Sequence, residues 1–531
     1  MTAQNRHATP LVSAPVAPSP RPPPWRDDVP AAIVTFLIAV PLCLGIALAS
    51  GAPLSAGIIA GVVGGLVAGG LSGSSLMVSG PAAGLTAIVL GGIQQVGFEG
   101  FLAAVVLAGV IQLGLAYLRA GFIGYYFPTA VIRGMLVGIG LILIFKQIPH
   151  ALGYDADAMG DDAFLQANAE NTFTAIIGAF RHLEWGAVII SALSLALLAV
   201  WRRTGLAKLR ALPAPLAVVV LGVLMNELFF ATAPGLALEP THLVNLPVPS
   251  SLGAYLDELH FPDFGAFADA STWRLATVLA VVASLETLLS LEATDRLDPY
   301  KREASTDREL LAQGTGNVIS GLLGGLPIAG VVVRSAANVE AGAVTRRATM
   351  LQGTLLLVAA LLAPRLLNEI PLAAVAAILI HLGARLASPR TAREEFALGR
   401  VHSVPFTATV VAIVLTDLLV GIVLGLAVGV YYILRDHLKS PPFTEVSAGG
   451  AVLRRLRLHD NVNFLHRAAF VTVLQAVPAG SRLEIDGRST RRLDSDVLEV
   501  ILNFRETAKL REIDYRLVGI PGAESAPDDA S

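Results

Sequence analysis

The chain has 531 residues, of which 54% are hydrophobic and only 15% are charged. A soluble protein of this length carries about 25% charged residues, so the composition excludes an ordinary soluble globular protein. The net charge of −3 gives no reason to expect nucleic acid as a partner. The first 28 residues, rich in proline and polar residues, are predicted to form a disordered tail.

After this tail, apolar runs long enough to cross a bilayer as helices recur along the chain. We predict fourteen spans and hence an all-α membrane domain over residues 29–437. They cover residues 31–49, 54–71, 81–92, 101–118, 130–148, 185–201, 213–230, 273–293, 310–323, 328–343, 348–362 and 371–382, then two short helices within 404–434.

The loops between the spans differ in charge, and this difference predicts the orientation. The loops after spans five and seven are acidic, whereas those after spans six, eight and twelve are basic. Basic loops stay in the cytoplasm, so an even number of spans with both termini cytoplasmic is predicted. The basic residues are Arg202, Arg203, Lys208 and Arg210, then Arg296, Lys301, Arg302 and Arg308, and finally Arg385, Arg390, Arg393 and Arg400.

Spans three and ten are short, and each follows a segment rich in glycine and proline, residues 79–84 and 324–330. They lie seven spans apart, which predicts two repeats of seven, and an odd number of spans inverts the second repeat. Interrupted spans at matching positions of two halves indicate a transporter's binding site. Helices that begin at mid-membrane depth point unpaired N–H groups and positive dipole ends at a ligand, so an anion site is predicted. The alternative is that both segments are ordinary kinks or close-packing points.

Two ionisable side chains fall within predicted spans. Glu286 lies in the middle of span eight, where a carboxylate costs about 2.5–3.5 kcal/mol and usually faces a cavity. Ser290, at i+4, lies on the same helix face, so the two are candidates for coupling to an ion or proton. The alternative for Glu286 is a structural hydrogen bond. Arg334 lies about two turns inside span ten, where it would strengthen anion binding, unless it pairs with Glu286 or Glu340 or reaches the cytoplasmic surface.

Several of these segments together resemble the SulP (sulfate permease) family of anion transporters. The resemblance covers nearly all of residues 27–520. It is carried by residues 38–47 with Pro41 and the single cysteine Cys43, and by Ser79-Gly80-Pro81. Residues 307–317, which lead into Gly324-Gly325-Leu326-Pro327, and Arg334-Ser335 complete the pattern. It implies seven plus seven inverted segments divided into a core and a gate domain, with substrate between the N-termini of spans three and ten.

Carried over by position, the resemblance assigns the substrate site. The backbone near the substrate would come from Ala82 and Ala83 on span three and from Gly330, Val331 and Val332 on span ten, with Arg334 at the family's basic position. Glu286 and Ser290 fall where sodium-coupled bicarbonate members have an aspartate and a threonine. A sodium ion at Glu286 and Ser290 is thus possible, although the longer glutamate and the two valines favour proton coupling or uncoupled exchange.

The opening segment is most similar to bacterial members associated with carbonic anhydrase. This implies bicarbonate as the transported anion, the inner membrane as the location, and functional association with carbonic anhydrase. Sulfate or a dicarboxylate is the alternative cargo. The family also implies a homodimer and no cofactor apart from Na⁺ or H⁺ as coupling ion.

Past Pro442 the composition changes to that of a soluble domain. The pattern predicts strands at 451–458, 482–486 and 515–519 and helices at 463–474 and 495–510. This α/β order resembles the cytoplasmic STAS domain of SulP proteins, here over residues 438–521, followed by a disordered tail at 522–531. Ser495 matches a position that is often phosphorylated, although Asp or Ser there would also serve as a plain helix cap.

Competing functions remain for the membrane domain. An anion channel or an electromotile protein would use the same fold. A nucleobase transporter would also share it but would place carboxylates on spans eight and ten, whereas span ten here carries Arg334. The sequence has no Walker motif, nucleophile elbow or metal constellation, so an enzyme is not expected.

Overall fold

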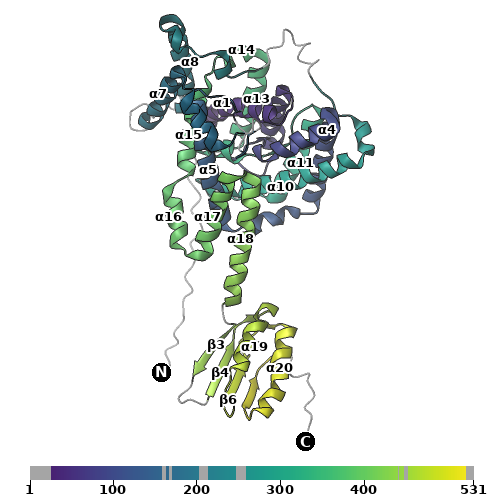
Figure 1. The fold of residues 1–531 in the computed structure, drawn as a ribbon. Coiled ribbons are helices and arrows are strands. Elements are labelled where there is room, and N and C mark those ends of the chain that lie inside the picture. Colours follow the sequence, from purple (N-terminus) through teal and green to yellow (C-terminus); the bar gives the residue numbers. More distant parts are fainter. Residues whose placement is uncertain are drawn as a thin grey trace, which may run out of the picture. The chain divides into compact units, whose positions relative to one another are not determined.

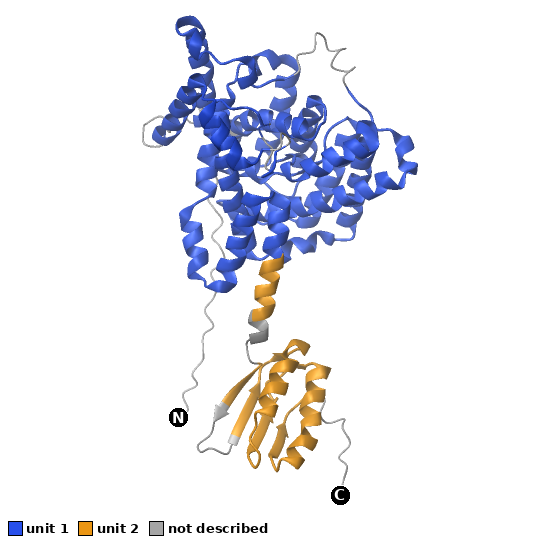
Figure 2. Cartoon of the chain, viewed as in Figure 1, with its two compact units in different colours: residues 1–426 blue, residues 427–531 orange. Residues whose placement is uncertain are grey.

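The computed structural model describes residues 25–157, 159, 163–166, 170–201, 213–246, 259–439, 442–447 and 453–521 (Figure 1). Three predicted segments lie outside these residues: residues 1–24 of the tail predicted at 1–28, the tail predicted at 522–531, and the basic loop with Arg202, Arg203, Lys208 and Arg210. The chain divides into two compact units, Met1–Leu426 and Ala427–Ser531 (Figure 2). The predicted domain boundary at 437/438 stays a prediction.

The larger unit is built of helices, and the last of them (α18, Leu418–Lys439) continues past Leu426 into the smaller unit. In chain order they are α1 (Trp25–Ala49), α2 (Leu54–Val63) continuing through a π-helical turn into α3 (Gly69–Leu71), α4 (Thr86–Tyr117), α5 (Thr129–Ala151), α6 (Thr172–Arg181), α7 (Trp185–Trp201), α8 (Ala214–Thr232), α10 (Ala270–Leu297), α11 (Thr306–Leu322), α12 (Val332–Glu340), α13 (Arg347–Leu362), α14 (Pro364–Leu367), α15 (Leu372–Leu386), α16 (Pro389–Ala397), α17 (Arg400–Leu415) and α18 (Leu418–Lys439).

Among the described residues, eight helices are long and apolar enough to cross a membrane, and the pair α6 and α7, bent by 114°, adds a ninth. The predicted count of fourteen is higher for two reasons. Spans three and four are joined in α4, which is kinked where Gly97 has a φ of 73°. Helices α11, α12, α13 and α17 occupy the other predicted segments but are only 9–17 residues long. The two helices predicted within 404–434 are present as α17 and α18, which are separated between Leu415 and Leu418.

The first helix begins earlier than predicted. Residues 25–28, assigned to the tail, form the start of α1. Asp28 is buried, and its carboxylate accepts hydrogen bonds from the backbone N–H groups of Val344 and Thr345 and from the Thr345 hydroxyl, at 2.8, 2.9 and 2.5 Å. This contact ties the start of the chain's helical part to the loop after α12, which a sequence pattern does not reveal.

The helices pack as two sets that match the predicted core and gate domains. In the core, α4 packs against α10 and α11, and α1 packs against α13. In the gate, α5 packs against α15 and α17, and α7 against α8 and α15. Two strands, β1 (Ser79–Pro81) and β2 (Ile328–Gly330), cross in the core and lead into the two broken spans.

The two halves meet in reciprocal contacts. Strands β1 and β2 occupy matching positions of the halves and pair antiparallel, with Ser79 opposite Gly330 and Pro81 opposite Ile328. Helices α5 and α15, the matching spans five and twelve, touch at Gly140 and Gly383. A Cβ atom at either glycine would lie 2.6–2.7 Å from the other's carbonyl oxygen. Matching segments that meet in this mutual way are expected of two inverted repeats around a two-fold axis, so the predicted fold class is confirmed.

The smaller unit contains a four-stranded sheet in the order β3 (Phe443–Ser447), β4 (Leu453–Leu458), β6 (Arg482–Asp486) and β8 (Asp514–Val518). Strands β4, β6 and β8 run parallel, and β3 joins antiparallel to β4. Helices α19 (Arg467–Gln475) and α20 (Ser495–Leu510) form the crossovers, and a short pair, β5 (Asn461–Val462) and β7 (Arg492–Leu493), lies apart. All predicted elements are present. Strands β5 and β7 were missed because each is only two residues long, and β3 was missed because it is defined by its pairing with β4.

One buried polar cluster lies in the loops that follow α5 and α8. The Asp155 carboxylate lies between two imidazoles, with Nδ1 of His150 at 2.5 Å and Nδ1 of His242 at 2.6 Å. Burial alone would raise the pKa of Asp155, but the hydrogen bonds and charges of the two histidines outweigh it and hold that pKa below its ordinary value. The hydrogen bond to Asp155 raises the pKa of His242.

These pKa shifts predict how stability depends on pH. Protonated His242 stabilises the folded state fully below its unfolded pKa of about 6.5, and this contribution is lost as pH rises through the raised folded pKa. The carboxylate of Asp155 loses its contribution only in acid. We expect wild-type protein to melt at a higher temperature than a His242→Gln variant at pH 6, with the gap closing by pH 9. A gap that stays constant, or an equal pH dependence in His459→Gln, would contradict this assignment.

Candidate functional site

The two broken spans are tied together at the β1–β2 crossing. The N–H of Val331 donates to the carbonyl of Val78 at 2.9 Å, and the N–H of Val78 donates to the Ser335 hydroxyl at 2.9 Å. The Asn338 side chain donates to the Leu76 carbonyl at 2.9 Å. Thus the start of α12 is fixed against the strand that leads into α4.

Helix α10 holds β2 from the other side. The Ser290 hydroxyl donates to the carbonyl of Gly330 at 2.7 Å, and the N–H of Gly330 donates to the Thr287 hydroxyl at 3.1 Å. Ser290 and Gly330, both predicted site residues, are therefore in direct contact. The sequence pattern missed Thr287, although it lies next to Glu286.

Helix α11 supplies a buried row of polar side chains at intervals of four residues, Glu309, Gln313 and Asn317. Asn317 exchanges two hydrogen bonds with the backbone of Ile328, at 2.6 and 2.9 Å. Gln313 donates to the Ser79 hydroxyl at 2.6 Å and to Glu309 at 2.9 Å. All three lie in the segment that carries the family resemblance, and the structure gives that segment a role: it positions both strands.

Both half-helices begin without a side-chain cap. Ala82 has extended backbone and precedes a short 3₁₀ turn, Ala83–Leu85, which leads into α4. Val331 has extended backbone and precedes α12, of which Val332 is the first residue. Neither Ala82 nor Val331 offers a side chain that could accept from the first N–H groups, so these donors remain available to a ligand.

Glu286 faces the first of these half-helices. Its residue exposure is only 7%. A Cβ atom placed on Gly84 would lie 3.1 and 3.2 Å from the two carboxylate oxygens of Glu286. The structure thus brings the predicted coupling residue to within contact distance of the segment that holds Ala82 and Ala83. A side chain at position 84 would press on the carboxylate, which would have to shift by a few tenths of an ångström.

Arg334 is fully buried, with 0% exposure. None of its three guanidinium nitrogens has a hydrogen-bond partner among the described residues. The side chain packs against Gly80 of β1, where a Cβ atom would approach a guanidinium nitrogen to 2.3 Å, and it lies close to the Cys43 thiol. Arg334 therefore neither reaches the surface nor pairs with Glu340, which instead forms an ion pair with Arg385.

A cavity of about 160 Å³ reaches this region and is lined by Ala83, Gly84 and Thr86 at the start of span three. Its lining also includes Gln166 and Asp417. Of the predicted substrate and coupling residues, Ala83 lines this cavity, whereas the others do not, namely Ala82, Glu286, Ser290, Gly330, Val331, Val332 and Arg334. The structure thus gathers the predicted residues around the β1–β2 crossing, and this cavity reaches them at the start of span three. Within the described residues, no group of three His, Cys, Asp or Glu side chains is arranged to hold a metal ion.

Ser495 in the smaller unit is exposed as the first residue of α20. The cap of that helix is Asp494, whose carboxylate accepts from the N–H of Asp496 at 3.0 Å. Phosphorylation of Ser495 stays a prediction.

Two inverted halves with a broken helix in each define a polytopic membrane transporter. Comparison with known proteins gives the family: residues 25–414 match the sulfate permease family, and the chain belongs to it. It is thus a multi-pass anion transporter and not an enzyme.

Relatives and solved structures agree with this assignment. The chain is 25% identical to a Bacillus subtilis protein named as a sulfate transporter, YvdB, over 77% of this chain and 74% of that protein. It is 27% identical to the bicarbonate transporter BicA of Picosynechococcus sp., over 76% and 69%. The transmembrane domain of a cyanobacterial BicA superposes with a TM-score of 0.53 at 23% identity, covering 76% of this chain and 97% of that one. Murine Slc26a9 superposes with a TM-score of 0.65 at 13% identity, covering 92% and 85%.

Proposed function

We propose that this protein is a secondary active transporter of bicarbonate that works by alternating access, with the anion held between the N-termini of α12 and of the span-three half-helix. The observation that carries the proposal is Arg334. A fully buried cation without a hydrogen-bond partner among the described residues is costly. A bound anion would remove that cost, because a guanidinium and an oxyanion match in charge and in hydrogen-bond geometry.

The remaining predicted residues have compatible places in this proposal. Ala82, Ala83 and Val332 would present backbone N–H groups, whereas the N–H of Val331 is already donated to the carbonyl of Val78. Val331 would therefore only fix the start of α12, and Gly330 would keep the two strands close together. Glu286 would take part in coupling, because a buried carboxylate beside the anion site changes its charge when it gains or loses a cation. The cation would be H⁺ or Na⁺. In a sodium site Glu286 would supply carboxylate oxygens, and Ser290 would add a hydroxyl oxygen while still donating to Gly330.

The basic loops support the orientation in the membrane, and the family resemblance supports the location. We propose a bacterial inner membrane with both termini, and hence the STAS-like unit, in the cytoplasm. A homodimer, a regulatory role for the smaller unit and functional association with carbonic anhydrase are further parts of the proposal that come from the family resemblance.

Uptake by purified protein in proteoliposomes tests the function. The assay would compare [¹⁴C]bicarbonate, [³⁵S]sulfate and a ¹⁴C-labelled dicarboxylate under imposed sodium and proton gradients. Saturable, gradient-driven bicarbonate uptake with counterflow is the expected result. Preference for sulfate or the dicarboxylate would show that bicarbonate is not the transported anion, and the proposed alternating-access mechanism would stand. Large unitary currents without counterflow would instead identify an anion channel.

A further inference from the structure

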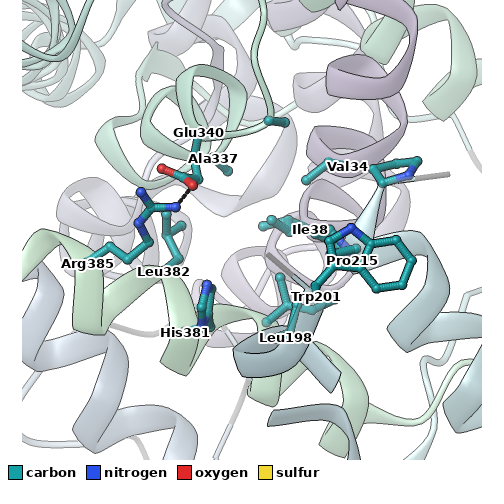
Figure 3. A pocket seen from close by; sticks show the side chains of 14 residues that line it. Val34, Ile38, Leu198, Trp201, Pro215, Ala337, Glu340, His381, Leu382 and Arg385 are labelled. Carbon is teal, nitrogen blue, oxygen red and sulfur yellow. Dashed lines mark ion pairs between the residues drawn. The ribbon is translucent and has the colours of Figure 1, made fainter. Parts of the chain in front are cut away.

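A second cavity, of about 310 Å³, lies between helices of the core and the gate (Figure 3). Its walls come from α1 and α12 of the core and from α7, α8 and α15 of the gate, together with Pro213 just before α8. Most of the lining is apolar, including Ile38, Leu198 and Trp201. Its charged or titratable lining side chains are Glu340, His381 and Arg385. The transport site described above does not include this cavity.

The polar groups of this cavity form a link between the two domains. Glu340 at the end of α12 makes an ion pair with Arg385 of α15, and His381, one turn before Arg385, points into the cavity (Figure 3). The side chains of Glu340 and Arg385 are 33% and 35% exposed. An ion pair with this much access to water is weak, so another anion can compete with the Glu340 carboxylate for the guanidinium.

The cavity has a defined place along the path that the proposed function requires. Ala337 lines the cavity three residues after Arg334 on α12, and Ala341, the residue that caps this helix, lines it seven residues after Arg334, so both continue the side of the helix that carries Arg334. In the predicted orientation, α7, α12 and α15 end on the cytoplasmic side, where α1 and α8 begin. Four of these helices thus contribute their cytoplasmic ends to the cavity, and α1 contributes Val34 and Ile38 from further along the helix. This arrangement fits a location between the cytoplasm and Arg334.

We propose that this cavity is a second anion station on the cytoplasmic side, where a small oxyanion displaces Glu340 from Arg385. The guanidinium would bind the anion through two N–H groups, and His381 would donate a further hydrogen bond. Occupation of the station would open the Glu340–Arg385 link between core and gate. Arrival of cargo would then release the domains to move. The station rests on the proposed function, because it is a step on the same transport path.

Two single substitutions separate an anion station from a plain structural link. Glu340→Gln removes the carboxylate that competes with the anion for Arg385, so the half-saturating anion concentration should fall about two- to fivefold. Arg385→Gln leaves Glu340 to repel the anion, so the concentration should rise by a similar factor, since one partly exposed ion pair is gained or lost. Both effects should appear with inside-out membrane vesicles, which present the cytoplasmic face, and not with right-side-out vesicles.

The assay measures [¹⁴C]bicarbonate uptake, or [³⁵S]sulfate uptake if wild type prefers it, with Arg390→Gln as control. Arg390 forms an ion pair with Glu394 at 2.9 Å and does not line this cavity. Shifts in opposite directions for the two variants support the station. Shifts in the same direction, or equal shifts on both faces, overturn it and leave only a structural link.

A binding measurement keeps this test independent of transport. Trp201 lines the cavity, whereas Trp185 does not. Addition of bicarbonate or sulfate to the purified full-length protein should change its tryptophan fluorescence. The change should be lost in Trp201→Phe and in Arg385→Gln but kept in Trp185→Phe. If wild type takes up no anion yet shows this pattern, the proposed function fails and the station stands. A fluorescence change that survives in Arg385→Gln overturns the station even if uptake is normal.

Discussion

Replacement of Glu286 by glutamine is expected to abolish coupled uptake while the protein still folds. Glutamine keeps nearly the same shape against Gly84 but cannot change its charge by binding a proton and binds Na⁺ poorly. Uptake driven by an imposed gradient should fall to the level of empty liposomes. The measurement is initial uptake under sodium and proton gradients, with monodispersity and thermal stability as checks of folding.

A matched control for this variant lies on the same helix. Thr277 is exposed on α10, and within the part of the chain that the structure describes its hydroxyl donates to the carbonyl of Trp273 at 2.8 Å and to no other group. Thr277→Val should therefore transport like wild type. Wild-type rates in Glu286→Gln with an unchanged dependence on pH or sodium would remove the coupling role and leave Glu286 as a structural residue.

Replacement of Arg334 by alanine is expected to weaken anion binding by about 10- to 100-fold, the range for losing hydrogen bonds to a charged group. The half-saturating concentration in proteoliposomes measures this loss. Arg334→Lys keeps the charge but not the two-pronged geometry, so it should fall between alanine and wild type.

Thermal stability gives a second test of the proposed role of Arg334 in anion binding. Because the guanidinium is buried without a hydrogen-bond partner among the described residues, removing it should not lower stability in the absence of anion. Saturating bicarbonate should raise the melting temperature of wild type but not of the alanine variant. Unchanged anion affinity, or a large loss of stability without anion, would show that Arg334 is structural.

Much of the fold follows from sequence patterns that have a direct physical cause. Long apolar runs predict the helices, and the clusters at 79–84 and 324–330 predict both broken spans, which the structure places at one crossing. Helix α20 begins and ends where predicted, because an acidic cap and an amphipathic period mark it. The start of α1 at Trp25 and the strand β3 depend on contacts with distant residues, which no local pattern records.

Less of the candidate transport site than of the fold could be predicted from the sequence. The pattern marked Glu286, Ser290 and Arg334 as ionisable or polar residues within apolar spans. It could not show that Ser290 and Thr287 hold the two sides of Gly330, or that Glu286 lies against Gly84. It also could not show that Arg334 has no hydrogen-bond partner among the described residues, since partners are set by packing. The roles assigned to these residues stay predictions until the variants are measured.

The reciprocal contact between Gly140 and Gly383 has a consequence for the transport cycle. When two inverted halves exchange their conformations, an outward-open protein becomes inward-open. A contact in which both halves take part equally is then the same before and after the exchange. Gly140 with Gly383, and β1 with β2, are contacts of this kind. They can serve as a pivot common to both end states. Substitutions there should harm the two states alike, whereas a preference for one state should come from contacts made by only one half.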